Sequence, residues 1–79
     1  MKESEVKVIQ VLKEAGNQLR WSELLERTGL SRRALSLALS KLQDDHLVRR
    51  IVDAESKEYP PPVYYKLTGR LDEIDYYFI

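Results

Sequence analysis

Apolar residues recur at intervals of three and four along the first 44 positions, a spacing that places side chains on one face of an α-helix. In residues 3–15 the stripe consists of Val8, Val11, Leu12 and Ala15. In residues 21–28 it consists of Leu24 and Leu25. Residues 32–44 carry the clearest stripe, which consists of Ala34, Leu35, Ala38, Leu39 and Leu42. The pattern therefore predicts three helices, at 3–15, 21–28 and 32–44.

Residues with special backbone or capping preferences mark the ends of these helices. Ser4 is placed to cap the first helix, and Gly16-Asn17 closes it. Gly29 ends the second helix because it adopts a left-handed conformation at low steric cost. Ser31 stands where the third helix needs an N-cap. A short, sharply defined turn is therefore expected between the second and third helices.

The following segment predicts extended structure. Residues 47–52 and 63–68 are rich in β-branched and aromatic residues, so two strands are expected there. The loop between them, 53–62, ends in three prolines, which cannot occupy the interior of a sheet. These prolines form either a stiff loop end or a short docking motif. Residues 18–20 can add only a short edge to the sheet.

Helical spacing returns at the end of the chain. Leu71, Ile74 and Phe78 lie at i, i+3 and i+7, which predicts a C-terminal helix at about 69–79. Apolar residues also widen the arc of the first helix. Either these surfaces pack within one subunit, or they form the seam of a two-fold homodimer, the commonest kind of oligomer. The expected interface residues are Val6, Ile9, Leu71, Ile74, Tyr77 and Phe78.

Composition narrows the class of protein. A chain of 79 residues is long enough for one domain, 1–79. It has no cysteine, which excludes disulfides and fits the reducing cytoplasm, and no apolar run long enough to span a membrane. His46 is the only histidine and lacks further ligands at metal-binding spacing. No catalytic grouping or phosphate loop is present, so we expect neither an enzyme nor a cofactor.

Charge is unevenly distributed along the chain. The formal net charge is zero, but residues 20–50 hold seven basic and four acidic residues, a net of +3. Charges in water act over only about 8 Å at physiological salt. A basic centre within a neutral chain can therefore still attract a nucleic-acid backbone.

The order of elements, with LSRRALSLALSKLQDDHLVRR followed by VYYKLT, resembles the winged helix-turn-helix regulators of bacteria and archaea. The MarR, ArsR, PadR and Lrp-type groups share this order of elements, and the resemblance covers nearly the whole chain. It is carried by Ser31, Leu35, Leu39, Leu42, Leu47-Val48 and residues 65–68. The resemblance implies an α+β, mostly α fold, with a helix-turn-helix at 21–44, a β-hairpin wing at 47–68 and a C-terminal helix.

The resemblance also implies that one face of the third helix meets the DNA major groove. Arg33 is suited to pair with guanine, and Ser36 to reach a base edge or a phosphate. Leu37 either touches a thymine methyl group or marks a surface that faces another protein. Phosphate contacts are expected at the sides of this face and at the helix N-terminus. The residues expected to face or flank the groove are Ser31, Arg32, Arg33, Ser36, Leu37, Ser40 and Lys41.

The wing adds basic residues at its base and mostly acidic residues in its loop. Arg49 and Arg50 are expected either to contact DNA together or to protect a solvated strand edge. Lys57 is the one loop cation and the expected wing contact, opposed by Asp53, Glu55 and Glu58. Trp21 is interpreted as an edge-of-core residue or, alternatively, as a base-stacking residue.

Together these features predict a sequence-specific double-stranded DNA-binding protein. It is expected to be a homodimeric transcriptional regulator with residues 31–41 in the major groove. The alternative is a winged-helix protein-interaction module of a larger assembly, which the zero net charge and Leu37 favour. Whether a small-molecule effector binds between the subunits stays open.

Overall fold

The computed structural model describes residues 1–68 and gives the α+β, mostly helical fold that was predicted. The three expected helices are α1 (Glu3–Glu14), α2 (Trp21–Thr28) and α3 (Arg32–Asp44). The strands are β1 (Gln18–Arg20), β2 (Val48–Val52) and β3 (Val63–Leu67). Predicted and observed ends differ by at most one residue. The predicted C-terminal helix at 69–79 lies outside the described residues.

The turn between α2 and α3 is built as the sequence predicts. Gly29 adopts a left-handed conformation with φ 69°, and its N–H donates to the carbonyl oxygen of Leu25. The hydroxyl oxygen of Ser31 accepts a hydrogen bond from the N–H of Ala34 at 3.1 Å. These two residues therefore stop one helix and start the next within three positions, which fixes the angle at which α3 leaves the turn.

The expected cap at the start of α1 was wrong. The helix begins at Glu3 with Lys2 at the N-cap, so Ser4 lies inside the first turn. The carboxylate of Glu5 accepts a hydrogen bond from the backbone N–H of Lys2 at 3.0 Å. An acid at this position satisfies a free N–H of the helix start and also suits the positive end of the helix dipole.

The ends of α1 and α3 share one hydrogen-bond pattern. The N–H of Asn17 donates to the carbonyl of Leu12, and the N–H of Leu47 donates to the carbonyl of Leu42. Both bonds span five residues, as in a Schellman motif. Gly16 supplies the left-handed residue at the first end, and His46, with φ 60°, supplies it at the second. His46 therefore has a backbone role at the end of α3.

The core lies where the three helices meet one face of the sheet. Its fully buried side chains come from every helix and include Val8, Leu12, Leu24, Leu35, Leu39 and Leu42. Ile9, for which the sequence left open a place in this core or at a dimer seam, is 7% exposed and belongs to the core. Val6 is half-buried, so more of its surface remains available to a second subunit than of Ile9.

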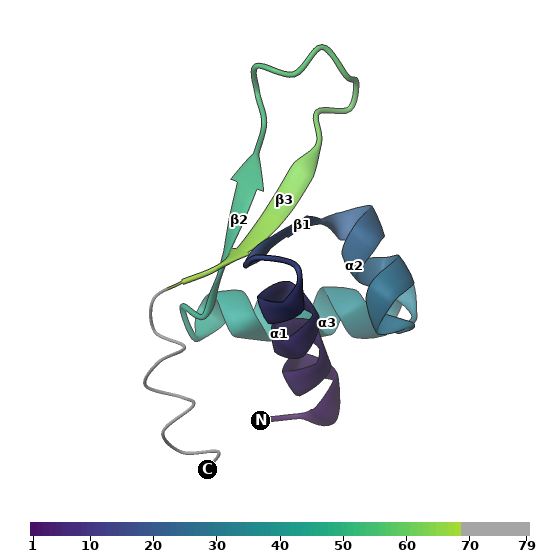
Figure 1. Ribbon diagram of the computed structural model, residues 1–79, viewed down its shortest axis with the longest axis vertical. Coiled ribbons are helices and arrows are strands. Elements are labelled where there is room, and N and C mark those ends of the chain that lie inside the picture. The colour runs from purple at the N-terminus through teal and green to yellow at the C-terminus, as the bar shows by residue number, and fades with distance from the viewer. Residues whose placement is uncertain (69–79) are drawn as a thin grey trace.

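The sheet is antiparallel with strand order β1-β3-β2, and its β2-β3 hairpin projects away from the helices (Figure 1). Tyr65 lies between Leu19 of β1 and Arg50 of β2 in the register. At the base of the hairpin, Thr68 donates from its N–H to the carbonyl of Leu47 and from its hydroxyl to that of His46. These bonds attach the wing to the end of α3.

None of the helices within residues 1–68 has the length and apolar character that crossing a membrane requires.

The backbone at Gly29 generates a stability prediction. We expect Gly29→Ala to lower the free energy of unfolding by about 1–2 kcal/mol, because a Cβ disfavours left-handed backbone. No atom lies within 4 Å of the position that this Cβ would occupy, so the cost comes from the backbone alone. Urea denaturation followed by circular dichroism measures it. The control Glu26→Ala, at an exposed site of α2, should change stability by less than about 0.5 kcal/mol. Equal effects would contradict the prediction.

Candidate nucleic-acid interface

The exposed face of α3 carries the residues that the sequence placed there. Arg33, Ser36 and Ser40 are exposed, and Leu37 is 62% exposed. The opposite side of the helix is buried in the core. A face that combines a guanidinium, two hydroxyls and one apolar side chain offers the types of group that read base edges in a major groove.

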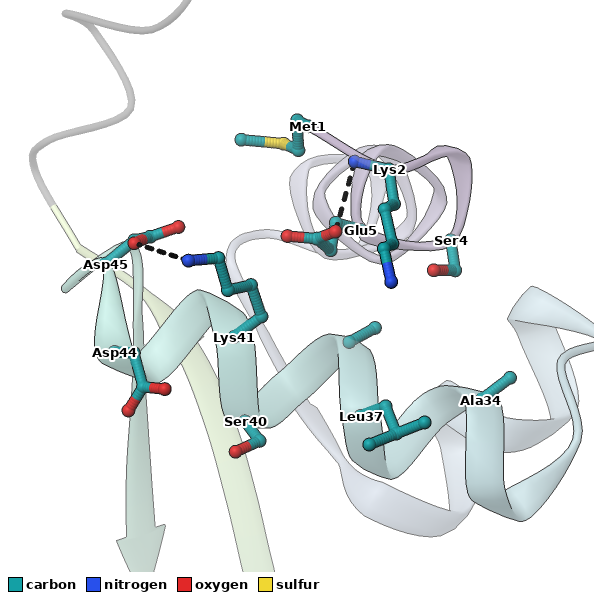
Figure 2. A pocket seen from close by; sticks show the side chains of 11 residues that line it. Met1, Lys2, Ser4, Glu5, Ala34, Leu37, Ser40, Lys41, Asp44 and Asp45 are labelled. Atoms are coloured by element: carbon teal, nitrogen blue, oxygen red, sulfur yellow. Dashed lines mark hydrogen bonds and ion pairs between the residues drawn. The ribbon is translucent and has the colours of Figure 1, made fainter.

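One residue of this face was missed. Asp44 lies 11 residues after Arg33, which is three helical turns, and it is exposed. Figure 2 shows Leu37, Ser40 and Asp44 spaced along α3, and all three line the open groove beside this helix. The front of α3 is therefore basic at its N-terminal end and acidic at its C-terminal end. The spacing of 11 residues, read along the sequence, would have revealed this carboxylate.

An open groove separates α3 from the first turn of α1 (Figure 2). Met1 and Lys2 line it from one side, and Leu37 and Lys41 line it from the other. Lys41 points along this side of α3, and its ammonium lies 3.5 Å from the carboxylate of Asp45. Lys41 therefore flanks the front face, as the resemblance implied, but an acid of its own helix partly neutralises it.

Arg32 lies on the other flank, next to α2. Its guanidinium carbon is 6.0 Å from the centre of the Trp21 ring. Trp21 is half-buried and packs against the core, which agrees with its interpretation as an edge-of-core residue. The ring packs against one side of the Arg32 guanidinium through a cation–π contact. The first turn of α3 therefore presents two cations, Arg32 and Arg33.

Arg49 and Arg50 lie on opposite faces of the sheet, because side chains alternate along a strand. Arg49 is opposite Lys66 on the outer face, whereas Arg50 is opposite Tyr65 on the core-facing side. The two arginines therefore face different surfaces, and their contact with DNA stays a prediction. Arg50 lines a hollow between the wing and the start of α2, which it shares with Arg20, Trp21, Ser22, Pro60, Pro61, Pro62, Val63 and Tyr65.

The wing loop folds back towards the start of α2. A guanidinium nitrogen of Arg20 lies 2.5 Å from a carboxylate oxygen of Glu58, and the same guanidinium lies 5.8 Å from the centre of the Tyr64 ring. The hydrogen bond and charge of Glu58 raise the pKa of Arg20 above its ordinary value. Lys57, which precedes Glu58 in the sequence, is exposed.

Comparison with known proteins agrees with this geometry. Residues 4–76 match the family described as HxlR-like helix-turn-helix. No protein of curated function matches the chain in sequence. The sequence alone had suggested MarR, ArsR, PadR and Lrp-type likenesses, and not this family.

Solved structures of transcriptional regulators are similar in fold. The reduced form of YodB from B. subtilis is 27% identical, with a TM-score of 0.78 over 98% of this chain and 72% of that chain. A MarR-family regulator from Silicibacter pomeroyi is 26% identical, with a TM-score of 0.77 over 94% of this chain and 47% of that one. NadR in complex with 4-hydroxyphenylacetate is 23% identical, with a TM-score of 0.77 over 92% of this chain.

This chain spans about half the length of NadR and of the Silicibacter pomeroyi regulator, at 49% and 47%. The MarR likeness is therefore supported in fold, whereas the ArsR, PadR and Lrp likenesses stay predictions. Because the family match covers nearly the entire chain, the protein belongs to the HxlR-like helix-turn-helix family and has the fold of DNA-binding transcription regulators.

Proposed function

We propose that this protein binds double-stranded DNA sequence-specifically and regulates transcription, with residues 31–41 of α3 in the major groove. The observation that carries the proposal is the exposed N-terminal half of α3. There, Arg32 and Arg33 follow the Ser31 cap, and neither forms an ion pair within residues 1–68. Helix-turn-helix proteins present this same end of the second helix of the motif to the bases.

In this arrangement the front of α3 supplies base recognition. Arg33 pairs with a guanine through two parallel hydrogen bonds, the commonest specific contact in the major groove. Ser36 and Ser40 donate to or accept from base edges or phosphates along the same face. Leu37 contacts a thymine methyl group. Asp44, at the far end of the face, disfavours close approach of a phosphate.

Phosphates are bound at the flanks of α3 and on the wing. Arg32 is supported by the Trp21 ring, and the free N–H groups beside Ser31 attract a phosphate. Lys41 reaches a phosphate from the α1 side, and Arg50 and Lys57 reach the backbone from the wing. Arg49 points to the outer face of the sheet, so it contributes to the local potential rather than to the same surface as Arg50.

This proposal predicts salt-dependent DNA binding that depends on the start of α3. In a fluorescence anisotropy titration with mixed-sequence duplex DNA, affinity should fall steeply as salt rises from about 50 to 200 mM. Arg32→Ala combined with Arg33→Ala should weaken binding at least about tenfold, because base and phosphate contacts are lost together.

The matched control is Lys7→Ala combined with Arg27→Ala, which removes the same charge from exposed sites on α1 and α2. It should weaken binding several-fold less than the α3 variant. If the wild-type protein fails to bind duplex DNA even at about 50 mM salt, the proposed function is wrong.

We further propose that the protein acts as a homodimer. The support is the half-buried Val6 on α1, together with the helical spacing of Leu71, Ile74 and Phe78 in the sequence. Tyr77 accompanies these residues, and Ile9 would contribute only its small remaining surface. Two copies of α3 would then meet half-sites about 34–36 Å apart.

The dimer is tested by its mass in solution. Sedimentation equilibrium should give twice the monomer mass of 9.3 kDa at micromolar concentration. Leu71→Ser combined with Ile74→Ser should shift the protein towards the monomer, because apolar area is lost from the seam. The control Asp72→Ser combined with Glu73→Ser should stay dimeric. A wild-type monomer at high micromolar concentration would rule the seam out.

The groove beside α3 favours a second candidate function, a protein-interaction module. Leu37 is 62% exposed at its edge, and the groove carries acids as well as cations. An exposed leucine between charges is a common centre for a protein contact. The titration above separates the two functions, since a module of this kind would not bind duplex DNA at low salt.

A further inference from the structure

Arg20 is a cation close to the proposed DNA surface that the sequence did not single out. It precedes α2 as the N-cap residue and forms an ion pair with Glu58, 38 positions later in the chain. The ring of Tyr64 lies against its guanidinium. Its side chain is therefore held by two groups of the wing rather than by its own neighbours in sequence.

Arg20 borders a basic and aromatic surface beside the wing. Together with Arg50 and Trp21 it lines the hollow between the wing and the start of α2. Trp21 in turn contacts Arg32 in the first turn of α3. The side chain of Arg20 itself shares the face of Tyr64, which is opposite the face of Arg50, so Arg20 stands at the edge of this surface and not in one row with Arg50. A DNA strand whose bases meet α3 would carry its phosphates over this surface.

We propose that Arg20 is a phosphate-binding residue of the DNA interface and that Glu58 is its competitor within the same chain. The inference rests on the proposed function and adds a residue to its binding surface. In the free protein the carboxylate of Glu58 forms an ion pair with the guanidinium of Arg20. In the complex with DNA, a phosphate replaces this carboxylate as the partner of the guanidinium. Glu58 therefore lowers DNA affinity.

The exchange is physically easy because the ion pair is exposed. The side chains of Arg20 and Glu58 are 37% and 59% exposed, and exposed pairs contribute little to stability. A phosphate offers the guanidinium a charge-assisted contact of the same kind, with two oxygens in the geometry of its fork. Binding a phosphate also releases counterions from the DNA, whereas the contact with Glu58 does not.

Glu55 provides a matched control for Glu58. Both are exposed carboxylates of the wing loop, three positions apart, but of the two only Glu58 forms an ion pair with a residue of the described range 1–68. Replacing either with glutamine removes one negative charge from the same loop. Any general effect of charge on DNA binding is therefore shared by the two variants, and only loss of competition for Arg20 is specific to Glu58→Gln.

The test is a fluorescence anisotropy titration of the full chain with one duplex at about 50, 100 and 200 mM salt. Glu58→Gln should bind about fivefold more tightly than Glu55→Gln. Arg20→Gln should bind more weakly than wild type, and the slope of log affinity against log salt should become shallower by about one. In the Arg20→Gln background, Glu58→Gln and Glu55→Gln should have equal effects.

Two results overturn the inference and leave the proposed function intact. In the first, the wild type binds DNA while Glu58→Gln and Glu55→Gln have equal effects in both backgrounds. In the second, Arg20→Gln leaves affinity and salt slope unchanged. Absence of wild-type binding at every salt concentration would instead remove the proposed function and this inference together. Circular dichroism melting of each variant distinguishes a lost contact from a lost fold.

Discussion

The burial of the apolar back of α3 is the constraint on which the rest of the structure depends. Leu35, Leu39 and Leu42 are 0–2% exposed against α1 and the sheet. Because a helix turns by about 100° per residue, fixing these three side chains also fixes which residues face solvent. The front face can then only be the line through Arg33, Ser40 and their neighbours. Packing therefore sets the chemistry of the exposed surface before any ligand is present.

The same packing determines where the wing stands. The chain leaves α3 through the left-handed His46, and the Thr68 hydroxyl bonds back to the carbonyl of that residue. Both ends of the hairpin are thus attached to the C-terminal end of the helix. The wing loop then reaches the start of α2, where Arg20 and Glu58 meet. Helix and wing form one connected surface because each is anchored to the other.

Local patterns in the sequence predict most of this fold. The spacing of apolar residues and the capping residues correctly predict the positions of α1, α2 and α3. Gly29 and Ser31 mark the turn between α2 and α3 correctly, because their effects on the backbone act within four residues. Ser4 failed as a cap because Glu5 competes for the same helix start. For Ile9 the sequence left open a place in the core or at a dimer seam, because the width of a buried arc depends on what packs against it, which the sequence of one helix does not contain.

Errors at the candidate site have two different causes. The opposed faces of Arg49 and Arg50, and the position of Asp44 on α3, follow from the periods of a strand and a helix, so the sequence already contained them. The contact of Arg20 with Glu58 was not available in this way. It joins residues 38 positions apart through an irregular loop, whose path no periodicity describes. Ion pairs of this kind determine how many cations on a surface remain available to bind a phosphate.

A net charge of zero is therefore compatible with DNA binding, because individual acids lie next to individual cations and neutralise those cations alone. Asp45 lies beside Lys41, and Glu58 beside Arg20, whereas Arg32 and Arg33 form no ion pair within residues 1–68. The helix dipole adds positive potential at this same end of α3, and Asp44 adds negative charge at the other. A phosphate backbone is thus attracted mainly to the first turn of α3. In the proposed DNA complex, attraction that is confined in this way would weaken non-specific binding more than it weakens a complex in which Arg33 also pairs with a base. The internal acids would then favour specificity over affinity.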